Sequence, residues 1–376
     1  MLQPLALELY RTVVENVDDT TDLLALALCC SALRDEAQRC LFRKVAKKSL
    51  AQQAQFISTI NASPSRFGPW VHDFYVVLYY EENLSPISSA LHAMRNLKHL
   101  QICLAGISKI LPGCTFKLRS LTCLYDNDLE YLLCHFLPTQ QSIKRIRFPA
   151  LGPPVGALDT AGMPMNLCPK LDFLDATDAR FVRAILRDSR LIKRFQWRSF
   201  GPLPSMTIKQ LNHLEYLYLT TEEWQIDSNF TRHLLSLVLL ELYDKQNDGR
   251  NVQTNFQFLQ NIPRLRVLIV SVGIFFARNW RSVDFRRNEL LSAPECAFGV
   301  HPTLELMSGT SWSGGYDCSN MPGPVLGRDR GHGEGDDELN GVDGKGLRFT
   351  PEDVVFEVWG IRKSRLEMGW RKMDCS

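Results

Sequence analysis

The side chains best able to carry out catalysis or bind metals, the cysteines and histidines, form no recognisable pattern in this sequence. Among 11 cysteines and 8 histidines there is no Cys-x-x-Cys and no His-Glu-x-x-His, the short spacings typical of zinc sites. The adjacent pairs Cys29–Cys30 and Cys134–His135 point to different faces of a helix or strand, which favours core cysteines. No Gly-x-Ser-x-Gly nucleophile motif occurs. The sequence predicts a protein that is not an enzyme, with no catalytic residues, no metal and no cofactor.

Arginines and aromatic residues in the middle of the chain are the candidates for binding a partner, since these types dominate interface energies. The candidate substrate-binding residues are Arg145, Arg147, Arg194, Trp197, Arg198, Tyr216 and Tyr218. Arginine forms bidentate pairs with carboxylates and phosphates, so the expected substrate is a protein with an acidic or phosphorylated segment. The alternative is that these residues form only the solvated face of a repeat protein.

An internal repeat would bring these residues together. The pattern Leu-x-x-Leu-x-Leu, with other apolar residues allowed at the leucine positions, begins at Val71, Leu97, Leu118, Ile143, Leu171, Ile192, Leu214, Leu237 and Leu265. Successive copies are 21 to 28 residues apart, as in leucine-rich repeats. Each copy predicts a short strand with alternate side chains in a shared core, and helices or turns on the return side. An irregular leucine-rich-repeat solenoid of the α/β class is expected over residues 46–306, with a return helix around 82–96.

Stacked strands of this kind expose the residues between the inward leucines on a concave surface. The third residues of the pattern form one column: Asp73, His99, Ser120, Arg145, Phe173, Arg194, Tyr216, Leu239 and Val267. The fifth residues form another: Tyr75, Gln101, Thr122, Arg147, Asp175, Gln196, Tyr218, Glu241 and Ile269. The two columns place the candidate arginines in neighbouring repeats.

Charge and hydropathy exclude other classes of partner. A net charge of +2 gives no general attraction for nucleic acid, so no nucleic-acid partner is predicted. The apolar run at Leu234 is far shorter than the ~20 residues of a membrane helix, so no membrane partner is predicted either. Charged residues interrupt the apolar start of the chain, which therefore does not resemble a signal peptide. We expect a protein of the cytoplasm, the nucleus or both, with reduced cysteines.

The first 45 residues predict an all-α unit of three short helices with more apolar surface than they can bury. Residues 5–17 carry one polar stripe, and residues 23–30 have no polar face, which indicates burial on every side. Acidic residues at 18–22 suit the start of the second helix. Leu33, Ala37, Cys40 and Leu41 form the apolar stripe of the third. A unit of this size needs a partner or a supporting domain.

This unit resembles an F-box. The resemblance rests on Leu5 to Leu9, Val13, Val14, Asp22 to Leu24, Leu26 to Ser31, Leu33, Arg34 and Leu41 to Arg43. Ala6 stands where the family usually has proline, and Phe42 stands where it usually has tryptophan. With the repeats that follow, the chain is similar to F-box proteins with leucine-rich repeats of the fungal type.

The resemblance implies the substrate receptor of a Skp-cullin-F-box ubiquitin ligase, in which the chain docks a Skp-type adaptor and, through it, a cullin-RING ligase. The repeats would hold the protein marked for degradation. By position, the adaptor-binding residues would be Leu5, Leu7, Leu9, Val13, Leu23, Leu24, Cys29 and Leu33. The alternative is a leucine-rich-repeat interaction scaffold with no ligase role, whose first helices cap the solenoid.

The end of the chain differs in composition. Residues 307–346 hold many glycines and few aliphatic residues, which predicts disorder. Apolar alternation returns within 347–376 and predicts a last strand, followed by a short basic helix.

Overall fold

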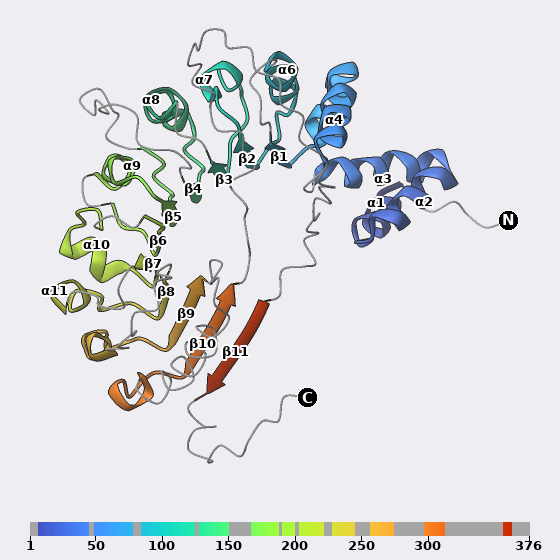
Figure 1. Cartoon of the computed structure of the whole chain (residues 1–376). Helices are drawn as coiled ribbons and strands as arrows, with labels where there is room; N and C mark the ends of the chain where they lie inside the picture. The colour runs from blue at the N-terminus through green and yellow to red at the C-terminus, as the bar shows by residue number, and fades with distance from the viewer. Residues whose placement is uncertain are drawn as a thin grey trace, which may run out of the picture. The chain divides into compact units, whose positions relative to one another are not determined.

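The leucine pattern forms a row of parallel strands in the computed structural model (Figure 1). The structure describes residues 7–44, 49–77, 84–124, 128–149, 167–187, 190–199, 203–221, 228–244, 256–273, 297–312 and 356–362. The chain divides into two compact units. The first is Met1–Leu219 with Arg232–Leu237, and the second is Thr220–Thr231 with Val238–Ser376.

The first unit contains one strand for each predicted repeat from Val71 to Leu214. The strands are β1 (Asp73–Val77), β2 (His99–Cys103), β3 (Ser120–Cys123), β4 (Arg145–Phe148), β5 (Phe173–Ala176), β6 (Arg194–Trp197) and β7 (Tyr216–Thr221). Neighbouring strands are parallel and pair by position in the pattern, so that Phe74 lies opposite Leu100 and Leu100 opposite Leu121. This register continues to Leu217. It confirms the predicted strands and the two predicted columns of residues in this unit.

The core of the first unit is made by the first, fourth and sixth residues of each repeat. In the second repeat these are Leu97, Leu100 and Ile102, all at most 2% exposed. Burying each side chain of this size stabilises the fold by about 1.5–3 kcal/mol. The return segments are α6 (Ser85–Ala93), α7 (Ile107–Ile110), α8 (Leu129–Tyr131), η2 (Leu132–Phe136), η3 (Leu137–Thr139), α9 (Ala179–Ile185) and α10 (Ile208–His213). Helix α6 confirms the predicted return helix, and these helices follow one side of the strands (Figure 1).

Buried amide side chains join neighbouring repeats on the return side. The Gln140 side chain accepts from the Leu118 amide, at the start of its own repeat, at 2.9 Å and donates to the Phe116 carbonyl of the preceding repeat at 3.2 Å. Gln210 donates in the same way to the Leu186 carbonyl at 2.7 Å. Buried backbone groups in irregular turns need such partners because they have no water to bind. These amides therefore link the return segments of neighbouring repeats.

A short helical segment covers the first repeat. It consists of α4 (Leu50–Ala62), α5 (Pro64–Phe67) and η1 (Gly68–Trp70). A capping box between Ser49 and Gln52 starts α4, and α4 packs against α6 with Phe56, Ile57 and Ile60 buried. Before it come α1 (Leu7–Glu15), α2 (Thr20–Cys29) and α3 (Ser31–Arg43), which confirm the three predicted helices. Asp19 caps α2 by accepting from the amides of Thr21 and Asp22.

The second unit contains β8 (Leu239–Asp244), β9 (Val267–Gly273), β10 (Leu306–Trp312), β11 (Phe356–Arg362), α11 (Ser228–Thr231) and η5 (Phe256–Asn261). Strands β8 and β9 confirm the last two predicted repeats, and β10 pairs with β9 in parallel. The prediction of disorder is wrong for residues 307–312, because strands on both sides satisfy their backbone groups. Strand β11, antiparallel to β10, confirms the predicted last strand. The rest of the predicted disordered segment and the predicted basic helix lie outside the described residues.

Candidate functional site

The three N-terminal helices share a very small core. Helix α3 packs against both α1 and α2, and the buried apolar residues of this core are Val14, Leu23 and Ala37. Partly buried residues complete it, among them Leu33, Cys40 and Leu41, which confirms the predicted stripe of the third helix. Three buried side chains stabilise a fold only modestly against the entropy of ordering three helices.

Large apolar side chains of α1 and α2 remain outside this core. Leu9 is 51% exposed and Val13 is 53% exposed on α1, one helical turn apart. Leu24 is 52% exposed and Leu28 is 82% exposed on α2, also one turn apart. We call these four residues the N-terminal apolar set. The prediction that residues 23–30 are buried on every side is wrong for this chain alone, because α3 covers only one face of α2.

The predicted adaptor-binding residues therefore divide by exposure. Leu9, Val13, Leu24 and Cys29 are exposed, whereas Leu23 is buried and Leu33 packs against the core. Leu5 and the side chain of Leu7 lie outside the described residues. Leu28 was not among the predicted residues, although its position four residues after Leu24 places it on the same helix face.

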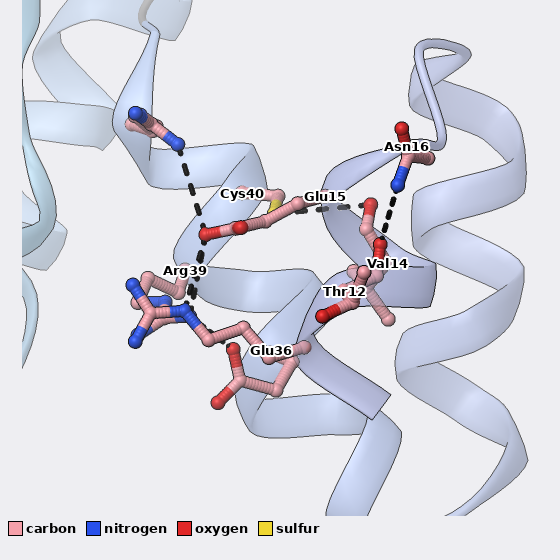
Figure 2. Close-up of polar contacts among 9 residues, drawn as sticks. Thr12, Val14, Glu15, Asn16, Glu36, Arg39 and Cys40 are labelled. Atoms are coloured by element: carbon pink, nitrogen blue, oxygen red, sulfur yellow. Dashed lines mark hydrogen bonds and ion pairs between the residues drawn. The ribbon is translucent and has the colours of Figure 1, made fainter. Parts of the chain in front are cut away.

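Charged residues hold α1 against α3 (Figure 2). The Glu15 carboxylate accepts from Arg11 Nε at 3.2 Å and lies 3.7 Å from Arg39 and 3.9 Å from Arg43. Arg39 also pairs with Glu36. The hydrogen bond from Arg11, and then the charges of Arg39 and Arg43, hold the pKa of the Glu15 carboxyl below its ordinary value. The polar side of α1 is thus paired within the chain, whereas Leu9 and Val13 on the same helix stay exposed.

The end of α3 is tied to the segment that covers the first repeat. Phe42 stacks on Phe67 with ring centroids 4.6 Å apart and packs near Phe56 and Trp70. The Arg43 carbonyl accepts from the His72 amide at 2.9 Å, and Arg66 donates to Asp35 and Gln38 of α3. Phe42 therefore anchors the three helices to the repeats.

Two of the candidate arginines converge on one buried carboxylate. The Asp175 side chain on β5 is 1% exposed and lies between arginines from neighbouring strands. Arg147 Nε donates to Asp175 Oδ2 at 3.1 Å, and Arg198 Nε donates to Oδ1 at 2.9 Å. The guanidinium of Arg198 also lies over the Tyr218 ring, 5.0 Å from its centroid. Part of the predicted positive charge is therefore neutralised inside the protein.

The other predicted substrate-binding residues have different surroundings. Arg194 pairs with Asp172, and Tyr216 accepts from the Gln196 amide at 2.6 Å, while Arg145 is exposed. Trp197 is 2% exposed, so its predicted role as a surface contact is wrong. It occupies the sixth position of its repeat, which points into the core, and its ring stacks near Phe195. Tyr218 is also buried, under Arg198.

Neither a metal site nor a membrane-spanning helix is found in the described residues. Among them, no three His, Cys, Asp or Glu side chains gather closely enough to hold a metal ion. None of the described helices is both long and apolar enough to cross a bilayer. Burial raises the pKa of the Cys114 thiol to about 11 and that of Cys168 to about 12, so these two thiols are protonated at neutral pH.

Comparison with known proteins adds little to this description. No family model matches the chain, and no curated protein matches it. Among solved structures it is similar to an internalin, inlF, from Listeria monocytogenes strain 4b F2365. That similarity has 13% identity and a TM-score of 0.36, over 73% of this chain and 87% of that chain. The repeat fold of this chain follows from its own strand register.

Proposed function

We propose that this protein is the substrate-recognition subunit of a Skp-cullin-F-box ubiquitin ligase. In this proposal the three N-terminal helices dock a Skp-type adaptor, and the repeats hold a target protein in the cytoplasm, the nucleus or both. The chain itself catalyses nothing. It would raise the effective concentration of the target beside the ubiquitin-bearing subunits.

The observation that carries the proposal is the N-terminal apolar set. Four large apolar side chains, Leu9, Val13, Leu24 and Leu28, stay at least half exposed on helices whose core has three buried apolar residues in the described part of the chain. Exposed apolar side chains in such number on so small a unit are typical of a surface that a partner covers. Covering them would also supply the stability that the small core does not provide.

The alternative, a scaffold capped by its first helices, is less well supported. A cap must lay its apolar face on the first repeat, and α4 already does this with Phe56, Ile57 and Ile60. The three N-terminal helices instead contact the rest of the unit through the end of α3, around Phe42 and Arg66. The N-terminal apolar set is at least half exposed, so it does not form the contact of a cap with the first repeat.

The test is co-purification of a Skp-type adaptor with the full chain. Leu9→Glu with Leu24→Glu should abolish adaptor capture, since glutamate keeps helix propensity but places charge in an apolar interface. The matched control is Leu50→Glu with Ile208→Glu, which charges two exposed apolar residues elsewhere. Both are the first residues of their helices, where an acidic group is favourable. The control variant should capture the adaptor as the unmodified chain does.

Two results would overturn the proposal. The first is an intact chain that never captures the adaptor, which leaves the scaffold as the better description if other proteins still bind the repeats. The second is a folded variant with Leu9→Glu and Leu24→Glu that captures the adaptor as the unmodified chain does, since the N-terminal apolar set would then not be the interface. Circular dichroism and limited proteolysis of both variants separate unfolding from loss of the interface.

A further inference from the structure

The second residue of each repeat stands in a column at the start of the strands. The His72 carbonyl accepts from the amides of Lys98 and His99, at 2.8 and 3.0 Å, and the Lys98 carbonyl accepts from Arg119 and Ser120 in the same way. The same pair of hydrogen bonds repeats from strand to strand along the first unit. The residues of this strand-start column are His72, Lys98, Arg119, Lys144, Asp172, Lys193 and Glu215.

Side chains in this column are close enough to interact. In its later part, Lys193 Nζ lies 2.9 Å from the Glu215 carboxylate, and Asp172 pairs with Arg194 of the next strand. The hydrogen bond and charge of Glu215, with a contribution from Asp172, raise the pKa of Lys193. In the later part of the column, acidic and basic side chains therefore neutralise each other's charge.

The earlier part of the column has no such compensation. Lys98, Arg119 and Lys144 follow one another, with Arg145 beside them, and Arg119, Lys144 and Arg145 are exposed. In the described part of the chain, these four residues take part in no ion pair. Burial, and then the charges of Lys98 and Arg43, lower the pKa of His72 at the start of the column. The positive charge in this part of the column therefore disfavours protonation of the neighbouring His72.

Such an arrangement lowers the stability of the free protein. Adjacent strands are about 4.8 Å apart, and like charges on neighbouring strands repel each other. An anionic partner would remove this repulsion. Acidic residues lie near both ends of this basic stretch. Near its start, Glu15 lies 3.9 Å from Arg43 and Asp73 lies 3.9 Å from His99. At its end, Asp172 follows Lys144 in the column. An anion that fits must be short, which favours a cluster of carboxylates over a nucleic acid or a bilayer surface.

We propose that Lys98, Arg119, Lys144 and Arg145 bind a short acidic segment of a protein partner. The inference rests on the proposed function only in taking the repeats as the part that holds a protein target, and it does not require adaptor docking. It moves the acidic-partner surface from Arg147 and Arg198, which are already paired with Asp175, to the starts of β2, β3 and β4, where the basic residues take part in no ion pair in the described part of the chain.

The test measures binding of a fluorescein-labelled peptide of alternating glutamate and serine to the full chain, by fluorescence anisotropy. Lys98→Gln with Arg119→Gln and Lys144→Gln should weaken binding by about tenfold, and added salt should weaken binding to the unmodified chain. The control removes the same charges from return helices: Lys109→Gln, Arg183→Gln and Lys209→Gln. This control should bind within about twofold of the unmodified chain.

Folding and specificity have their own controls. The glutamine variant should melt at the same temperature as the unmodified chain or slightly higher, because repulsion is removed. A charge-keeping variant, Lys98→Arg with Arg119→Lys and Lys144→Arg, should keep binding. The proposal is overturned if the glutamine variant binds as the unmodified chain does, or if a glutamine-serine peptide binds equally well.

Other outcomes show whether the acidic-segment site or the ligase role has failed. Tighter binding of single-stranded RNA or of phosphatidylserine vesicles at the same residues would refute an acidic protein segment as the ligand. Adaptor capture, measured on the same samples, should not change in the glutamine variant. If the adaptor is never captured but peptide binding depends on these residues, the acidic-segment site stands and the ligase role fails.

Discussion

The three N-terminal helices and the repeats of the first unit use their apolar residues differently. The helices bury Val14, Leu23 and Ala37 and leave the N-terminal apolar set at least half exposed. The repeats bury nearly every inward position and even pair a buried carboxylate, Asp175, with two arginines. The repeats therefore cover their own apolar residues, whereas the helices leave apolar surface that no described residue covers.

The largest effect should come from truncating a core residue of the repeats. Ile146 is 0% exposed at the centre of β4, so Ile146→Ala should lower the free energy of unfolding by about 2–5 kcal/mol. Leu24→Ala in the N-terminal set should change it by less than about 0.5 kcal/mol, since the side chain is half exposed. Urea unfolding followed by tryptophan fluorescence measures both. Comparable losses would mean that the N-terminal set is part of a core.

Removal of the buried carboxylate should have the next largest effect. Asp175→Ala leaves Arg147 and Arg198 without their shared partner and should cost about 2–3 kcal/mol, less than for fully buried pairs because both arginines are partly exposed. Arg147→Ala should cost less, since its side chain is 47% exposed. A double-mutant cycle between Asp175 and Arg147 isolates their coupling. A coupling of zero would show that the pair does not contribute to the stability of the repeats.

The close contact between the covering segment and the first repeat gives a smaller effect. A Cβ added to Gly68 would lie 2.5 Å from the Ala93 carbonyl oxygen, so Gly68→Ala should cost about 1–3 kcal/mol. Gly299 is the matched control, because a Cβ there meets nothing within 4 Å and alanine favours its helix. Thermal melting should therefore show a loss for Gly68→Ala and no loss for Gly299→Ala. Equal behaviour would remove the evidence that η1 packs tightly on α6.

The smallest effect should come from the cap of α2. Hydrogen bonds from the Thr21 and Asp22 amides hold the pKa of the Asp19 carboxyl below its ordinary value. Its contribution is therefore fully present above the unfolded pKa and is lost as the pH falls through the folded pKa. Asp19→Ala should lower the helicity of the N-terminal helices slightly at neutral pH, and the difference should shrink in acid. Asp19→Asn, which still accepts hydrogen bonds, should show little change at either pH.

Much of the fold followed from local patterns. The spacing of apolar residues predicted strands β1 to β9 and both outward columns within each unit, because a strand alternates its side chains between two faces. The same spacing places Trp197 at the sixth position of its repeat, which points inward, so its burial could have been predicted from the sequence. Strand β10 was missed because its sequence is poor in apolar residues. Its pairing depends on backbone groups of β9 and β11, and β11 lies more than 40 residues further along the chain.

The sequence alone determined the phase of the repeats, the three N-terminal helices and their surplus of apolar residues, since periodicity is a property of the local backbone. The tertiary structure decided which of those residues are covered, with Leu23 in the core and Leu24 outside it. It also decided that Arg147 and Arg198 share Asp175, whereas Lys98, Arg119 and Lys144 share no acid in the described part of the chain. Pairing depends on which groups meet in space, and return segments of unequal length separate those groups along the sequence.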